Sequence, residues 1–433
     1  MKRTLQRLWL SLRSSLWFVP SLIVVGGIIL AISMSELDKR FDGDLASRLP
    51  RVFGAGAEGS RALLGAIATS MMTIMGVTFS ITIVALSLAS TQFTPRIVRN
   101  FMRNRTTQFV MGAFSSVFVY CLIVLRTIQG GDEEFVPDMS ILFGIILALA
   151  SVWVLILFIH HMASSIQAST VISDAAEETI ETIRKLFPER MNEEDDEKPQ
   201  LDGGPWYPVA ASSTGYIQLI DEEALTKLAK EQDAVFRVER SSGDFVVKDS
   251  PVLSVQAAGP PNETICKEVR SAFGIGNFRT VDQDAAFGVR QLVDIAMKAL
   301  SPSLNDSTTA VNCVDYLGAI LAELAPRRIR SREDAGTGAG SRLIFKGTTF
   351  EDFVDTAFNQ IRESAEGNAA VLIRMLRSIE VISTYTTIAR RRRVLARHVD
   401  MIEETAQRTM MPAYARQQVM DRVQAAKASL AAA

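Results

Sequence analysis

The sequence predicts a membrane α-helical protein with four transmembrane helices. A cytoplasmic α+β region with a small β-barrel-like module and a C-terminal helical bundle follow them. Three observations support this prediction. Nearly all long apolar runs lie in the first 160 or so residues, the remainder alternates short strand-like and helix-like patterns, and the second and third loops between the apolar runs carry a basic cluster and an acidic cluster respectively. The net charge of −2 over 433 residues hides this uneven distribution.

Four segments are apolar and long enough to cross a bilayer, which takes about 20 residues of helix. They are residues 16–32, 62–90, 109–125 and 141–159. Basic residues before the first segment could mark a signal peptide, but Trp17 and Pro20 at its start favour a retained, anchored helix. We therefore predict a transmembrane domain over residues 1–165.

The loops between the spans predict their orientation. The loop after the second span is basic, with Arg96, Arg99, Arg103 and Arg105. The loop after the third span is acidic, with Asp132, Glu133, Glu134 and Asp138. Short basic loops remain in the cytoplasm, so the first loop is expected inside and the second outside. Both termini and the large C-terminal region are then cytoplasmic.

Residues 166–205 are predicted to form a stalk helix and an acidic linker. The stretch from Asp174 to Lys185 is polar enough to stand in water, and Asn192 to Lys198 is an acidic run. Pro188 and Pro205 flank this run, which is typical of a linker.

Residues 206–345 are predicted to form an α+β domain. Strand-like segments at 216–221 and 234–239 enclose a short helix at 222–230, and 242–247 with 251–255 suggests a hairpin. The order of glycines and apolar pairs resembles the barrel-sandwich hybrid of biotinyl and lipoyl modules. Lys248 is not placed for lipoylation, so we interpret the segment as a small structural barrel.

A turn motif separates two helices expected at 290–299 and from Ser307 to about Ala325. It contains Ser301, Pro302, Asn305 and Asp306. Such residues cap helices and form turns, and a polar turn is the simpler explanation, with a ligand site as the alternative.

Residues 346–433 are predicted to form a helical domain. Its four arginines at 390–393 lie in a helical pattern with acids nearby, so we expect a solvated face or contact with anionic lipid. No nucleic acid is expected as a partner; membrane lipids are.

Two segments resemble a known family. They are Phe79–Arg96, with the sequence FSITIVALSLASTQFTPR, and Phe287–Asp306, which contains FGVRQLVDIA and ALSPSLND. Both are similar to motifs of a bacterial family of predicted membrane proteins, domain of unknown function 2254. The family often has proline where this chain has Ser307. The resemblance implies the membrane plan and a bacterial inner (plasma) membrane location, and it implies no activity.

No catalytic constellation is recognisable, so we expect no enzyme. There is no phosphate-binding loop and no nucleophile elbow. The chain has three histidines and three cysteines, Cys121, Cys266 and Cys313, without paired spacing. We therefore expect free thiols, no metal site and no cofactor.

The second span is the most informative segment, because it is uncharged yet rich in hydroxyl groups. Thr69, Thr73, Gly76, Ser80 and Ser87 fall on one helical face. One hypothesis is an oligomeric ion channel in which this face lines the pore. Asp132, Glu133, Glu134 and Asp138 would then form the outer mouth, Arg96, Arg99, Arg103 and Arg105 the inner mouth, and the cytoplasmic region a vestibule or gate.

The alternative hypothesis is a membrane-anchored sensory or scaffold protein, in which the same face is a helix-packing seam. Small residues let helices approach closely in membranes. The cytoplasmic region would then bind a ligand or partner. Leucine at Thr73 or Ser80 should block conduction in a pore but block assembly in a seam.

Overall fold

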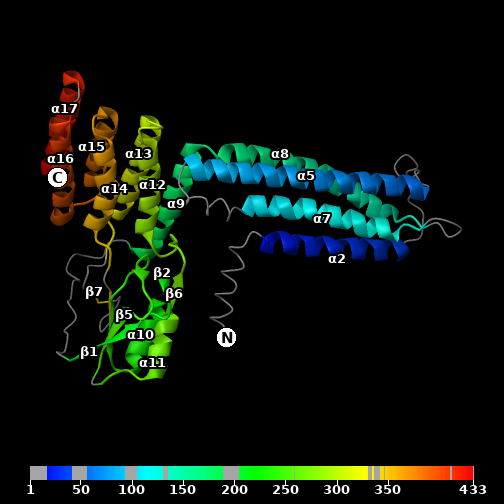
Figure 1. Cartoon of the computed structure of the whole chain (residues 1–433), viewed down its shortest axis with the longest axis horizontal. Helices are drawn as coiled ribbons and strands as arrows, with labels where there is room; N and C mark the ends of the chain where they lie inside the picture. The colour runs from blue at the N-terminus through cyan, green and yellow to red at the C-terminus, as the bar shows by residue number, and fades with distance from the viewer. Residues whose placement is uncertain are drawn as a thin grey trace. The chain divides into compact units, whose positions relative to one another are not determined.

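The computed structural model describes residues 17–40, 56–92, 105–129, 135–188, 204–257, 259–329, 334–335, 342–345, 347–409 and 412–432. The chain divides into two compact units, Met1–Gln167 and Ala168–Ala433. The first unit is helical, and the second combines helices with two small sheets (Figure 1).

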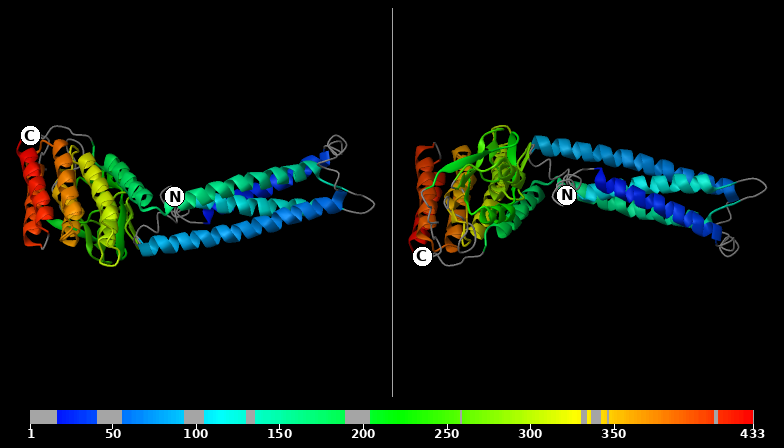
Figure 2. Two further views of the ribbon diagram at one scale, coloured as in Figure 1. Left: turned by 90° about the horizontal axis from the view of Figure 1, so that it is seen from above. Right: turned by 90° about the horizontal axis from the view of Figure 1, so that it is seen from below.

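Four helices make up the described part of the first unit, and each is long and apolar enough to cross a membrane. They are α2 (Phe18–Arg40), α5 (Gly56–Gln92), α7 (Arg105–Thr127) and α8 (Asp138–Ser165). They lie side by side in every view (Figure 1, Figure 2). This arrangement confirms the four predicted spans, although each helix extends beyond the apolar run that identified it.

Helix α7 is the most enclosed of the four. It packs against α2, α5 and α8 and buries Phe114, Tyr120 and Cys121. Its contact with α2 is close, because Gly27 lies against Ser116 and a side chain at that position would collide with it. The small residue therefore fixes how near the two helices approach.

The sheets of the second unit are open. One has the strand order β1-β5-β3-β8-β7 and the other β4-β2-β6. The strands are β1 (Trp206–Ala210), β2 (Gly215–Ile220), β3 (Val235–Val238), β4 (Phe245–Val246), β5 (Pro251–Gln256), β6 (Phe273–Gly276), β7 (Asp334–Ala335) and β8 (Leu343–Phe345). The helices α10 (Glu222–Glu231) and α11 (Glu263–Ala272) accompany them.

The prediction of a barrel-like module is therefore wrong, because the expected hairpin of 242–247 with 251–255 does not form. Strand β4 pairs with β2, whereas β5 pairs with β1 and β3. The reason is the burial of β5, whose residues from Val252 to Gln256 are all buried. A strand covered on both faces belongs in the centre of a sheet, between two neighbours.

Seven further helices belong to the second unit as far as the structure describes it. They are α9 (Ala168–Leu186), α12 (Ala285–Ala299), α13 (Ser307–Leu324), α14 (Phe350–Ser364), α15 (Ala369–Thr384), α16 (Ala389–Arg408) and α17 (Ala413–Ala432). Helices α12 and α13 pack against α14 and α15 respectively. Strand β8 joins the sheet of β3. The predicted division at residue 345 lies within the compact unit Ala168–Ala433.

Helix α9 is packed, which differs from the predicted free stalk of residues 166–205. It contacts α12 and α13 and buries Val171, Ile172 and Ile183. Thr179 is buried as well, with its hydroxyl donating to the carbonyl of Ala175 at 2.6 Å. The helix looks polar in sequence because alanines and threonines, rather than large apolar residues, complete its buried face. The acidic run 192–198 lies outside the described residues.

Candidate functional site on the outer face of α5

The five predicted pore residues share one face of α5, and that face points away from the rest of the unit. Thr69, Thr73, Gly76, Ser80 and Ser87 are all exposed. The opposite face of the helix is buried and includes Leu64, Ala68, Met71, Thr78, Ala85 and Ala89. A Cβ added to Gly65 or Gly76 would meet no atom within 4 Å. No helix of the described unit covers the hydroxyl face.

Three of the four hydroxyl groups on this face donate hydrogen bonds within α5. Thr69 donates to the carbonyl of Gly65 at 2.9 Å, and Thr73 donates to that of Thr69 at 3.0 Å. Ser80 donates to the carbonyl of Gly76 at 3.0 Å. Such back-bonding satisfies the donor and leaves the oxygen lone pairs free to accept from water or to face a cation. These three groups can therefore be solvated, and they can also pack dry with their donors satisfied.

Large apolar side chains flank the hydroxyl face. Phe79, Ile83 and Val84 are each about half exposed, with 53%, 48% and 58% of their surface accessible. Helix α5 thus presents an apolar surface beside a polar stripe. The stripe is narrow, so it can face a partner or water while its flanks contact lipid or neighbouring subunits.

Two of the predicted mouth residues lie in the described ranges. Arg105 begins α7 and is exposed, whereas Asp138 begins α8 and is partly buried. Because α7 and α8 are antiparallel neighbours joined by a short connection, these residues lie at opposite ends of the unit. The other predicted mouth residues, Asp132, Glu133, Glu134, Arg96, Arg99 and Arg103, lie outside the described residues.

A polar contact at the Asp138 end was not predicted. Asp38, near the end of α2, accepts hydrogen bonds from the backbone N–H groups of Met139 and Ser140 at 2.9 and 3.0 Å. Its carboxylate also accepts a short bond from the Ser140 hydroxyl. Tyr120 donates to the Ser140 carbonyl at 2.8 Å. Asp38 thus caps α8 from another helix, and an acid at a helix C-terminus was the sequence clue to such a partner.

The turn motif of Ser301, Pro302, Asn305 and Asp306 joins α12 to α13. Asp306 caps α13 by accepting from the Thr309 backbone N–H at 3.0 Å and the Thr309 hydroxyl at 2.6 Å. These bonds lower the pKa of the Asp306 carboxyl. Asn305 takes a left-handed conformation with a φ of 47°. The turn is mostly exposed, so its polar groups are used for the turn and the cap rather than enclosing a cavity.

The arginine run has a partly structural use that sequence patterns did not reveal. Arg391 donates to the carbonyl of Ala325, at the end of α13, at 2.6 Å. Arg392 donates to the carbonyls of Ser429 and Leu430, near the end of α17, at 3.1 and 2.7 Å. Cations stabilise the carboxyl ends of helices. Arg390 and Arg393 are exposed, as a solvated face requires.

Among the described residues, no group of three or more histidine, cysteine, aspartate or glutamate side chains could hold a metal ion. The three cysteines are free thiols, and Cys121 and Cys313 are buried. Burial raises the pKa of the Cys313 thiol beyond its usual range.

Comparison with known proteins shows that most of the chain is similar to one family. The profile of the family described as predicted membrane protein (DUF2254) matches residues 13–381. An uncharacterized protein of Mycobacterium tuberculosis is 28% identical over 408 residues, which is 92% of this chain and 77% of the relative. An uncharacterized protein of Mycobacterium bovis matches to the same extent. No solved structure matches the chain.

Proposed function

We propose, from the premise that the chain belongs to the DUF2254 family of predicted membrane proteins, that it forms a homo-oligomeric ion channel. Helix α5 would line the conduit, and the second unit would serve as a vestibule or gate on the cytoplasmic side. The basic loop of residues 96–105 supports this orientation and an inner-membrane location.

One observation supports the channel above all. The hydroxyl face of α5 lies opposite its buried face, so it is available to surround an axis shared by several copies. Copies arranged with this face inward would bring rings of threonine and serine oxygens together. Such oxygens can accept hydrogen bonds from water or face a cation inside a conduit.

The ends of the unit carry opposite charges in this proposal. Arg105 lies at the end assigned to the cytoplasm and Asp138 at the end assigned to the outside. Acidic residues at an outer mouth concentrate cations. The two ends favour ions of opposite sign, so the reversal potential has to decide the selectivity.

Planar-bilayer recording in asymmetric KCl tests the proposal directly. We expect discrete currents from the purified full-length chain and loss of current in Thr73→Leu and Ser80→Leu. Val77→Leu is the matched control, because Val77 is 51% exposed on the same helix but off the hydroxyl face. The oligomeric mass of each variant in detergent must be measured beside the currents.

A different observation supports the sensory or scaffold alternative: hydroxyl groups of α5 donate to carbonyls of the same helix. Because Thr69, Thr73 and Ser80 donate within α5, the face can also form a dry seam with a second copy. In that case Thr73→Leu and Ser80→Leu would dissociate the oligomer. A well-assembled but silent wild-type protein, with leucine variants that dissociate, would contradict the channel.

A further inference from the structure

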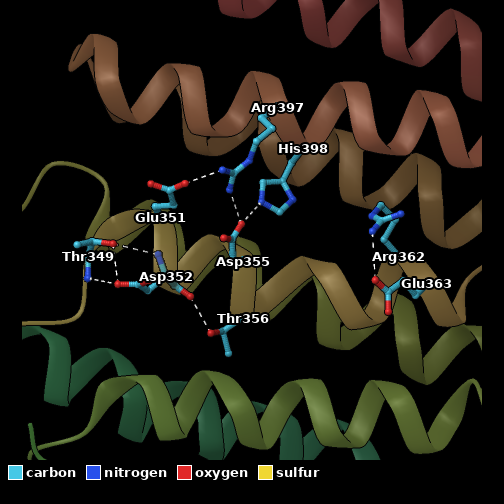
Figure 3. Close-up of polar contacts among 9 residues, drawn as sticks. All are labelled: Thr349, Glu351, Asp352, Asp355, Thr356, Arg362, Glu363, Arg397 and His398. Atoms are coloured by element: carbon cyan, nitrogen blue, oxygen red, sulfur yellow. Dashed lines mark hydrogen bonds and ion pairs between the residues drawn. The ribbon is translucent and has the colours of Figure 1, made fainter.

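A buried histidine joins two helices of the second unit. His398 of α16 is fully buried, with 0% of its surface exposed. Its Nε2 lies 2.8 Å from Oδ1 of Asp355 in α14 (Figure 3). The ring also makes an edge contact with Phe358 of α14, with 5.9 Å between the ring centroids. The imidazole is therefore part of the α14–α16 interface.

The second nitrogen of this ring makes no hydrogen bond within the described part of the chain. It is Nδ1 of His398, and it is buried. Because Asp355 is an acceptor, the hydrogen of the neutral ring belongs on Nε2, and Nδ1 is an acceptor without a donor. Protonation would turn Nδ1 into a buried charged donor without an acceptor, which costs more than the neutral arrangement.

The charges around His398 come from both helices. On α14 they are Glu351, Asp355 and Arg362, and on α16 the neighbouring cation is Arg397. Asp355 is the only one of these that contacts the ring, and it already accepts a bond of 2.6 Å from Arg397. The negative charge of Asp355 is thus partly compensated by Arg397 before His398 gains a proton.

Other elements that pack on α16 contribute charges elsewhere. Lys427 of α17 binds Asp400 and Glu403, which lie on another face of α16. Glu380 of α15 is paired with Arg422 of α17. These groups are paired with one another rather than with the ring, so the groups that decide the charge of His398 are those of α14 and Arg397.

We propose that His398 is a pH-sensitive latch, which holds α16 against α14 when neutral and releases it when protonated. The inference is independent of the proposed channel. It extends to α17 as well, because α17 packs on α16.

The difference between the pKa of His398 in the closed and released states decides how pH changes the latch. Burial lowers the pKa of His398 despite Asp355, which acts in the opposite direction. In the released state the ring meets water, where its pKa returns to about 6.5. The latch is therefore fully stabilising above about pH 6.5 and weakens as the pH falls below it. A single proton changes the opening equilibrium by at most about tenfold per pH unit.

Amide hydrogen exchange on the full-length chain tests the latch between pH 7.5 and 5.0, after correction for the chemical exchange rate. His160 and His161 are the other two histidines. Replacing both by glutamine leaves His398 as the sole histidine, whose ring titration can be followed by NMR. We expect opening in peptides of α14 and α16 to increase severalfold to tenfold per pH unit below 6.5.

The matched variant is His398→Gln in the same background. The glutamine amide keeps a donor for Asp355 but takes up no proton, so opening should become independent of pH. The same slope in His398→Gln, or a His398 ring that titrates at or above pH 6.5, would overturn the latch. An equal increase in peptides of α12 and α13 would also overturn it, because the whole unit would then be responding.

A second variant keeps the test decisive if His398→Gln does not fold. Asp355→Asn retains an acceptor for Nε2 but removes the negative charge that favours imidazolium. The ring should then titrate at lower pH than in the parent chain, and opening should continue to increase to lower pH. An unchanged or higher titration midpoint would contradict the arrangement proposed here.

Discussion

Single residues decide how the helix ends are held. Asp38 supplies a carboxylate to the first backbone N–H groups of α8, and Arg391 and Arg392 supply cations to the last carbonyls of α13 and α17. Each contact joins residues far apart in the sequence. A helix end left without such a partner keeps unsatisfied backbone groups.

Asp38→Ala should lower the free energy of unfolding of the first unit by about 2 kcal/mol, the upper range for loss of a helix cap. Thermal unfolding of the full-length chain in detergent measures the change. Glu36→Ala is the control, because Glu36 forms an exposed ion pair with Lys39 on the same helix and caps no other helix among the described residues. Equal effects of the two substitutions would argue against the cap.

Arg391→Met should destabilise the second unit by about 1–2 kcal/mol, since it removes a charge-assisted bond to the end of α13 but keeps an apolar stem. Arg393→Met provides the comparison within the same run, because Arg393 is exposed. We expect it to change stability by less than about 0.5 kcal/mol. Denaturant unfolding of both variants gives the difference.

At the scale of whole elements, close helix crossings depend on glycine. Gly288 of α12 lies against Thr179 of α9, where an added Cβ would come 2.0 Å from the threonine Oγ1. Gly318 of α13 meets Ser378 of α15 in a similar way, with 2.9 Å between the added Cβ and Oγ. The two glycines therefore let α9 approach α12 closely and α15 approach α13 closely.

Gly288→Ala should therefore cost about 1–3 kcal/mol through overpacking. Thr179→Ala removes the two nearest atoms, so the double variant should recover part of that loss. Gly259→Ala, at a site with no atom within 4 Å of the added Cβ, should be nearly neutral. A double variant that is no more stable than the additive sum of the single changes would show that the crossing had been misplaced.

The sequence predicted elements better than it predicted their partners. The long uncharged runs predicted the four apolar helices, and the alternation of apolar and polar residues predicted β2 and β3. Pairing was harder, since β4 and β5 are close in sequence but belong to different sheets. Helix α9 was misjudged because buried threonines satisfy their own hydroxyls, as Thr179 does. For the candidate site, the shared face of Thr69 and Ser80 followed from helical spacing, but its position opposite the buried face required the fold.

At the scale of the whole molecule, the second unit has its own buried core. Helix α9 begins that unit and contributes Val171 and Ile183 to it. We expect a chain that begins at Ala168 to be soluble and to unfold cooperatively, as a compact unit with its own core can. Circular dichroism and size-exclusion chromatography test this. A chain beginning at Pro205, which lacks α9, should be less stable or aggregate.

The length of α5 links the protein to the thickness of its bilayer. The helix carries no charge from Ala62 to Ser90, which is about 43 Å of apolar rod in a hydrocarbon layer of about 30 Å. It must tilt, or its ends must leave the layer. Lipids with longer acyl chains should straighten the helix, and shorter ones should incline it further. The thickness of the membrane should thus act on this protein as a mechanical signal, through the tilt of α5.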